Sequence, residues 1–197
     1  MKISRRIVIA VALVIVFGSV ASAQLFSRSK YESAKYEVKE TDGDFEIRDY
    51  PELVVAAAPM SEGDGDRNSA FRKLFGYISG KNATSEKIAM TTPVFMTPKK
   101  GKEKTMAFVV PAKVAKAGAP SATDKKVKVT KRAAGKFAVY RYSGRWTEER
   151  EKKSRERLKA WLKDKGLVSK GAFETAAYDP PFTPGFLRRN EILVRVE

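Results

Sequence analysis

The residues that could carry chemistry in this 197-residue chain are carboxylates, tyrosines and methionines, because it has no His and no Cys. Without His the chain builds no Ser-His-Asp triad, no imidazole general base and no His-ligated zinc site. Without Cys it has no thiolate nucleophile, disulfide or iron–sulfur cluster. The acidic pairs Asp42/Asp44 and Asp64/Asp66 have the spacing of turns and lack the other ligands of a calcium loop. We therefore expect a binding protein rather than an enzyme, with no catalytic residue and no metal site.

An aromatic edge on one expected helix is a candidate binding surface. The helix is expected from Asp66 or Asn68 to about Ser79. Its apolar side chains are Ala70, Phe71, Leu74, Phe75, Tyr77 and Ile78. At ~100° per residue they cover an arc of roughly 160°, wider than the ~100° stripe that one core contact needs. Either both sides of the helix are buried, or the edge that carries Phe71 and Phe75 lines a cleft.

Short alternating strands surround this helix, and the same order of elements follows later in the chain. In the first half, strands are expected over residues 36–39, 45–48, 53–58, 87–96 and 105–110. In the second half, a helix capped by Thr147 lies between strands expected over residues 127–129, 137–140, 173–178 and 192–196. Strand-strand-helix-strand-strand, twice, indicates an internal duplication with pseudo-two-fold symmetry. We expect an α+β fold in which a curved antiparallel sheet, closed or nearly closed, packs against two helices.

The first 23 residues have the three parts of a secretory signal peptide. Basic residues precede an apolar run over 7–17, and Ala21-Ser22-Ala23 offers small residues to a signal peptidase. The run is shorter than the ~20 residues of a spanning helix. We therefore expect cleavage near Ala23-Gln24 and export to the periplasm or the extracellular space, with an uncleaved N-terminal membrane anchor as the alternative. Residues 24–35 are expected to be a tether and residues 36–197 the binding domain.

The chain is strongly basic, with 39 Lys and Arg against 23 Asp and Glu and a net charge of +16. Removal of the signal peptide takes away three basic residues and leaves +13. The basic runs at 99–102 and 125–126 lie in expected turns without interleaved aromatic residues, and export removes the chain from most nucleic acid. We expect a monomer with no nucleic-acid partner, attracted peripherally to anionic envelope surfaces.

Five motifs in this order resemble the SOUL haem-binding protein family over about residues 36–197. They are Phe71-x-x-Leu74, Gly80-x-Asn82, Met90-Thr91-x-Pro93-Val94, Tyr178-Asp179-x-Pro181 and Arg188-Arg189-Asn190-Glu191. Each motif is weak alone, but the five together are specific. The resemblance implies a bacterial, exported member with a distorted antiparallel β-barrel, two helices and a doubled ββαββ plan, an architecture shared with gyrase-inhibitor-like effector-binding domains.

The resemblance also implies that haem or a related tetrapyrrole binds in a surface cleft between the first helix and the Tyr-Asp-x-Pro loop. Carried over residue by residue, the apolar cleft positions are Phe71 and Phe75, and the polar position near the start of the helix is Arg67 or Asn68. Thr183 stands where the family often has a Lys, which removes one expected partner of a propionate. Some members use a His as axial ligand, and this chain has none.

A porphyrin is a flat apolar disc with two carboxylates on one edge, so aromatic faces and rim cations can hold it without imidazole. Phe182 and Phe186 are expected to stack on it, and Arg188 or Lys73 to meet its carboxylates. Iron could take a Tyr or Met ligand, although a Met on a strand usually belongs to the core. We therefore predict loose, exchangeable binding with a weak or absent axial ligand. The predicted cofactor-binding residues are Arg67, Asn68, Phe71, Phe75, Phe182, Thr183, Phe186 and Arg188.

Glu191, in the last of these motifs, allows two interpretations. In the first, one of the arginines at 188 and 189 pairs with it at the start of a strand and fixes the register. In the second, its carboxylate lies inside the mouth of the barrel and binds a cationic ligand, as in gyrase-inhibitor-like domains. The alternative function is therefore a small-molecule-binding or hydrolytic domain of that architecture with a different ligand.

Overall fold

Most of the chain forms short strands, because apolar and polar residues alternate and Gly, Pro and Asp interrupt them every few residues. The structure, a computed structural model, describes residues 31–60, 64–98 and 104–197. The expected signal peptide at 1–23 and the first part of the expected tether lie outside the described residues. Within the described ranges, no helix is both long and apolar enough to cross a bilayer.

The described residues form eleven strands, three α-helices and one 3-10 turn. The strands are β1 Glu32–Ser33, β2 Glu37–Asp42, β3 Phe45–Tyr50, β4 Leu53–Met60, β5 Thr91–Thr92, β6 Val94–Pro98, β7 Lys104–Val109, β8 Lys128–Arg132, β9 Gly135–Ser143, β10 Ser169–Ala177 and β11 Arg189–Val196. The helices are α2 Asp64–Ile78, α3 Ala112–Ala117, α4 Glu148–Asp164 and the 3-10 turn η2 Gly185–Leu187. The strand expected over 87–96 is thus replaced by β5 and β6, and the additional helix α3 follows β7.

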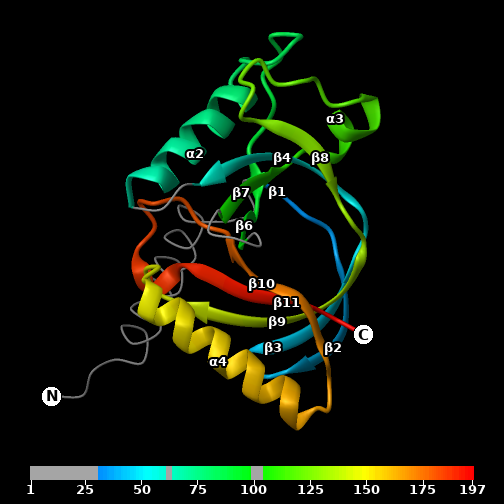
Figure 1. Cartoon of the computed structure of the whole chain (residues 1–197), viewed down its shortest axis with the longest axis vertical. Coiled ribbons are helices and arrows are strands. Elements are labelled where there is room, and N and C mark those ends of the chain that lie inside the picture. The colour runs from blue at the N-terminus through cyan, green and yellow to red at the C-terminus, as the bar shows by residue number, and fades with distance from the viewer. Residues whose placement is uncertain (1–30, 61–63, 99–103) are drawn as a thin grey trace, which may run out of the picture. The chain divides into compact units, whose positions relative to one another are not determined.

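Nine of the strands form an open sheet, which corrects the expectation of a barrel. Their order is β2-β3-β9-β11-β10-β6-β7-β4-β8, and every neighbouring pair is antiparallel. The sheet curves strongly, yet its edge strands β2 and β8 do not pair with each other within the described residues (Figure 1). Both edges carry lysine and other charged side chains, which oppose further strand pairing. The fold is therefore α+β, with a mostly antiparallel open sheet and three α-helices instead of two.

The duplicated order of elements is present, and the two halves exchange their first strands. One half runs β3, β4, α2, β6, β7, and the other runs β8, β9, α4, β10, β11. β3 pairs with β9 of the second half, and β8 pairs with β4 of the first. β6 and β10 pair in the middle of the sheet. From β3 to β8 the strand order therefore reads the same from either end, as a pseudo-two-fold relation requires.

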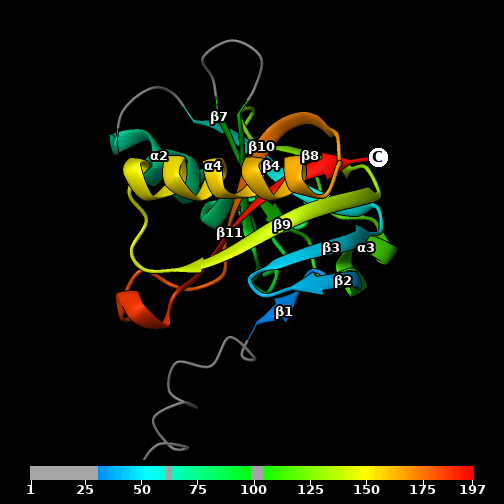
Figure 2. The ribbon, with the colours of Figure 1, turned by 90° about the horizontal axis from the view of Figure 1, so that it is seen from below.

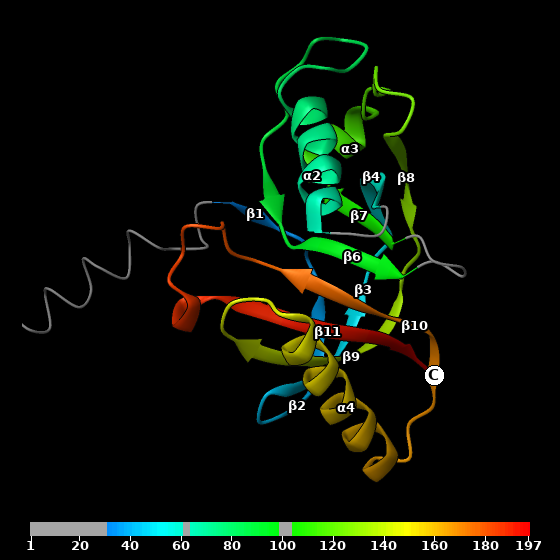
Figure 3. The same cartoon turned by 60° about the vertical axis from the view of Figure 1, so that its left-hand side comes forward.

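Helices α2 and α4 cover the same face of the sheet (Figures 2 and 3). Met96 in the core under α2 pairs with Thr175, which pairs with Ile192 in the core under α4. Directly paired residues of neighbouring strands point to the same side, so the two cores lie on the same face of the sheet. A third core lies on the inner side of the curve, and the segment from Ala34 to Tyr36 packs against it.

The N-terminal boundary of the folded unit lies earlier than the expected start at residue 36. The unit begins at Tyr31, because β1 pairs in parallel with β5. The Ala34 N–H also donates to the Thr92 carbonyl at 2.8 Å. Residues 31–35 therefore belong to the domain, and any tether ends before them.

Candidate functional site

A pocket of about 570 Å³ lies between α2 and the loop that joins β10 to β11. This loop, residues 178–188, contains η2 and faces α2 on the left of Figure 1. We call the cavity the α2 pocket. Its size is within the range of small-molecule sites. Its lining residues are Tyr31, Arg67, Asn68, Phe71, Phe75, Met90, Thr92, Val94, Met96, Met106, Trp146, Ala177, Tyr178, Asp179, Pro180, Pro181, Phe182, Arg188 and Asn190.

The aromatic edge of α2 lines this pocket, as the second interpretation of the helix predicted. Phe71 and Phe75 are 37% and 52% exposed, and their rings stack with centroids 6.1 Å apart. Phe71 also meets the edge of Phe108 at 5.3 Å, which fixes the ring against the sheet. The opposite side of the helix is buried, including Leu74 and Tyr77. The wide apolar arc therefore serves two purposes, since one edge packs in the core and the other forms a wall of the pocket.

Methionines of the sheet form the floor of the pocket. Met96 on β6 and Met106 on β7 are directly paired across the two strands and belong to the core under α2. Met90 packs against the same core. From the sequence, these residues were interpreted as ordinary core methionines. The placement of Met96 and Met106 in the floor depends on the pairing of β6 with β7. Thioether side chains are flexible and polarizable, so such a floor adapts to an apolar ligand.

A guanidinium group is held inside the pocket wall by an aromatic ring. The Arg67 Cζ lies 3.4 Å from the centroid of Trp146, and Arg67 Nη2 donates to Met96 Sδ at 3.0 Å. The indole itself is fixed, because its Nε1 donates to Glu151 at 2.8 Å. Arg67 was expected at the site, whereas Trp146 was not, because a Trp just before a helix cap carries no sequence signal of its own. Asn68 lines the pocket beside Arg67.

Some of the residues predicted for the site in the 178–188 loop line the pocket, and others do not. Phe182 lines the pocket and is 74% exposed. Arg188 also lines it, and its guanidinium donates to the carbonyls of Thr183 (2.8 Å, from Nε) and Pro181. Thr183 and Phe186, which were also predicted, are not among the described residues that line the pocket. Thr183 is buried in the turn, and Phe186 points to solvent from η2 with 78% exposure.

Lys73, which the sequence offered as a second carboxylate partner, does not line the described pocket either. Its Nζ donates to Ser69 Oγ at 2.5 Å, one turn earlier on α2. The cations that the structure brings to the pocket are therefore Arg67 and Arg188.

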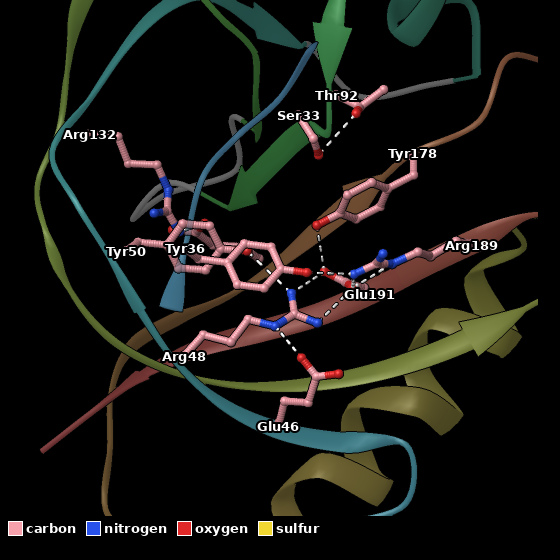
Figure 4. Close-up of polar contacts among 11 residues, drawn as sticks. Ser33, Tyr36, Glu46, Arg48, Tyr50, Thr92, Arg132, Tyr178, Arg189 and Glu191 are labelled. Carbon is pink, nitrogen blue, oxygen red and sulfur yellow. Dashed lines mark hydrogen bonds and ion pairs between the residues drawn. The ribbon is translucent and has the colours of Figure 1, made fainter. Parts of the chain in front are cut away.

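Glu191 lies behind the pocket on the inner side of the sheet, in an ion cluster where its buried carboxylate meets the buried Arg48 and the partly exposed Arg189 (Figure 4). Arg48 donates two hydrogen bonds to the Glu191 carboxylate, from Nη1 to Oε2 at 2.8 Å and from Nη2 to Oε1 at 3.0 Å. Arg189 reaches the same carboxylate from the other side, with Nε at 2.8 Å from Oε1 and Nη2 also bonded to it. The Tyr178 hydroxyl donates to Oε2 at 2.9 Å. The Glu191 oxygens are thus met by five donors, as the interpretation of a structural pair predicts.

The charges in this cluster stay ionised despite their burial. Burial raises the pKa of the Glu191 carboxyl, but the hydrogen bond and charge of Arg48, with Arg189, outweigh it and hold that pKa below its usual value. Burial and the neighbouring Glu191 charge raise the pKa of Tyr178 well above its usual value. Tyr178 lines the α2 pocket as well, so a neutral, anchored phenol separates the pocket from the ion cluster.

Comparisons with known proteins identify one family and solved structures of similar fold, two of which are described here. A sequence model described as "SOUL heme-binding protein" matches residues 31–195. None of the curated proteins in the comparison matches the chain. The EcmrR C-terminal domain has 12% sequence identity and a TM-score of 0.60, with 82% of this chain and 98% of that chain covered. A hydrolase from Listeria innocua also has 12% identity, with a TM-score of 0.56 and coverage of 81% of this chain and 94% of that chain. At such identities these two structures show a similar fold alone.

Proposed function

Because the chain belongs to the SOUL heme-binding protein family, we propose that it binds haem or a related tetrapyrrole in the α2 pocket and catalyses no reaction. The observation that carries the proposal is the composition of the pocket wall. Aromatic rings from α2 and from the 178–188 loop face a methionine floor, and two arginines lie among them. Such a wall matches a wide apolar ligand that carries carboxylates.

The shape and charge of a porphyrin fit this wall. The stacked rings of Phe71 and Phe75 and the exposed ring of Phe182 offer faces on which a flat macrocycle can stack. Arg67 is oriented by Trp146, and guanidinium groups bind carboxylates through two parallel hydrogen bonds. Arg188 uses Nε and Nη2 for loop carbonyls, and a guanidinium has five N–H donors, so it can also serve a propionate.

We propose that no protein side chain ligates the iron strongly. Haem iron takes His, Cys, Met or Tyr from proteins, and this chain has only the last two. Tyr178 keeps its proton, since its pKa is raised and its hydroxyl donates to Glu191. The Met96 sulfur accepts a hydrogen bond from Arg67. Affinity would then come from the macrocycle and its carboxylates, which suits a protein that carries or buffers its ligand.

We also propose an exported monomer, cleaved near Ala23-Gln24, that is attracted peripherally to anionic envelope surfaces and does not bind nucleic acid. The net charge of +16 and the N-terminal apolar run over 7–17 support this. In the alternative, that run remains as an N-terminal membrane anchor.

The alternative of a different ligand on the same architecture has less support from the geometry. A cationic ligand would need the Glu191 carboxylate, which Arg48 and Arg189 already hold. A hydrolytic domain is suggested by solved structures titled as hydrolases, at 12% and 11% identity. The experiment below separates these functions from tetrapyrrole binding.

The test is a titration of the purified protein with haemin and with metal-free protoporphyrin, followed by absorbance and by quenching of Trp146 fluorescence. We expect both to bind with affinities within about a factor of three, because stacking and carboxylate contacts do not involve the metal. Much tighter binding of haemin would contradict the absence of a strong axial ligand. Binding of neither would overturn the proposed function and leave the fold unaffected.

Matched variants locate the ligand in the α2 pocket. Arg67→Gln should weaken binding of protoporphyrin about tenfold or more, since a charge-assisted hydrogen bond is lost. The same variant should bind the dimethyl ester of protoporphyrin as well as the wild type does, because the ester has no carboxylate. Phe75→Ser should weaken binding of both compounds. Val38→Ser, at a site 45% exposed on β2, is the control and should change neither.

A further inference from the structure

Large exposed apolar side chains are concentrated on the two elements between which the α2 pocket lies. Of the seven exposed large hydrophobic side chains in the described residues, five belong to α2 or to the 178–188 loop. These five, which we call the mouth patch, are Phe71, Phe75, Phe182, Phe186 and Leu187. Phe186 and Leu187 do not line the pocket, so ligand binding does not account for their exposure. Apolar side chains that gather on one surface mark a site of interaction.

The loop presents its two phenylalanines from a fixed backbone. The Thr183 N–H donates to the Pro180 carbonyl at 3.0 Å, and the Thr183 side chain is buried. The Gly144 N–H donates to the Gly185 carbonyl at 3.0 Å, which ties the loop to the segment after β9. A preorganised apolar surface loses little conformational freedom when it binds. Phe182 and Phe186 are therefore well placed to insert into another apolar phase.

Cationic side chains accompany the mouth patch. Arg145 packs against the loop, since a Cβ added to Gly185 would lie 3.2 Å from its Cγ. Arg72 is exposed on α2 next to Phe71, and Arg188 lies at the end of the loop. The whole chain carries a net charge of +16. Aromatic rings bordered by arginines suit the interface of a bilayer that contains anionic lipids, where the rings enter the acyl boundary and the cations meet phosphates.

This combination of exposed phenyl rings and nearby arginines favours an anionic lipid surface as the partner.

We propose that the mouth patch inserts into the interface of anionic membranes, so that the α2 pocket opens onto the bilayer. The inference deepens the peripheral attraction proposed above, because it names the surface that makes the contact. If the pocket binds a tetrapyrrole, which is the function proposed above, the ligand could pass between the membrane and the pocket without crossing bulk water.

The test is cosedimentation with vesicles of phosphatidylglycerol and phosphatidylcholine, compared with vesicles of phosphatidylcholine alone, and without any tetrapyrrole. Since residues 31–197 form a unit with its own cores, the chain is started at Gln24, so that the N-terminal apolar run contributes nothing. We expect binding to the anionic vesicles. The double variant Phe182→Ser/Phe186→Ser should bind them about tenfold or more weakly, because two phenyl groups lose their apolar contact. The control Val168→Ser replaces a side chain that is 62% exposed elsewhere and should bind as the wild type does.

The outcomes separate this inference from the proposals on which it builds. Equal binding of the wild type and the double variant to anionic vesicles would leave the charge attraction intact and overturn the mouth patch. Absence of binding by the wild type would overturn both the charge attraction and the insertion of the mouth patch. It would point to a protein or nucleic-acid partner for the patch. Insertion itself is read from Phe186→Trp, whose added fluorescence should shift to shorter wavelength with anionic vesicles. Val168→Trp should show no shift, and a shift of equal size there would contradict insertion through the loop.

Discussion

Glu191 is the residue whose replacement should affect the fold most directly. Glu191→Gln removes the anion that Arg48 and Arg189 share and leaves the buried Arg48 with Glu46 as its remaining carboxylate partner, so we expect the free energy of unfolding to fall by about 3 kcal/mol. Unfolding in guanidinium chloride measures the loss. The control is Glu37→Gln, whose side chain is 70% exposed in a salt bridge with Lys39 and should cost less than about 1 kcal/mol. Equal losses in the two variants would show that the buried cluster does not hold the fold.

At the scale of single residues, the motifs pointed to Arg67 and Phe75, which line the α2 pocket, and missed positions that depend on a distant contact. The pairing of Glu191 with an arginine was foreseen, but its main partner, Arg48, is 143 residues away in the chain. Trp146 has no motif, and its role follows only from the stacking of Arg67 upon it. Thr183 was misplaced because a turn buries it, which the spacing of the loop does not reveal.

Helix α4 shows how one local signal sets the boundary of an element. The Thr147 side chain accepts a hydrogen bond from the Arg150 N–H at 3.1 Å, and acidic residues occupy the first turn. Thr147→Ala should lower the free energy of unfolding by about 1 kcal/mol, because a backbone donor loses its partner. Thermal unfolding measures the change. The control Thr147→Ser keeps the oxygen and should lose much less. A Ser variant as unstable as the Ala variant would show that the methyl group, and not the cap, matters.

At the scale of elements, the sequence predicts the order of helices and strands along the chain. It does not predict which distant strands pair. The capped helix and the repeated strand-strand-helix-strand-strand order are local patterns, and both are present. The exchange of β3 and β8 between the halves depends on which distant strands meet, and alternation along one strand does not specify its neighbour. The expected barrel failed for the same reason, because closure is a property of the two edge strands together.

In the molecule as a whole, the two faces of the sheet carry different features. The helix-covered face carries the α2 pocket, and the inner face carries the charged cluster around Glu191. Tyr178 belongs to both, since its ring lines the pocket and its hydroxyl binds Glu191. With no disulfide available, this buried cluster and the three cores supply the rigidity that keeps the pocket open while exposed aromatic side chains surround it.

The stability of the whole fold should fall at both ends of the pH scale. Glu191 has a lowered pKa in the folded state, so its contribution is present above the usual carboxyl pKa and is lost as the pH falls below it. Burial raises the pKa of Tyr50 and of Tyr142 to about 12, so their contributions are complete below pH 10 and are lost as the pH rises toward 12. Unfolding free energies measured from pH 3 to 12 should form a plateau from about pH 6 to 9.

Tyr142 allows a test of the loss of stability at alkaline pH, because its hydroxyl is buried and has no hydrogen-bond partner within the described residues. Tyr142→Phe should be neutral or slightly stabilising at pH 7, since no bond is lost. Between pH 10 and 12 its stability should fall less steeply than that of the wild type, by up to about 1.4 kcal/mol per pH unit, the slope that one proton gives. Parallel slopes for the two proteins would mean that Tyr142 titrates alike in the folded and unfolded chains, and that the alkaline loss comes from other groups with raised pKa values, such as Tyr50, Tyr77 and Tyr178.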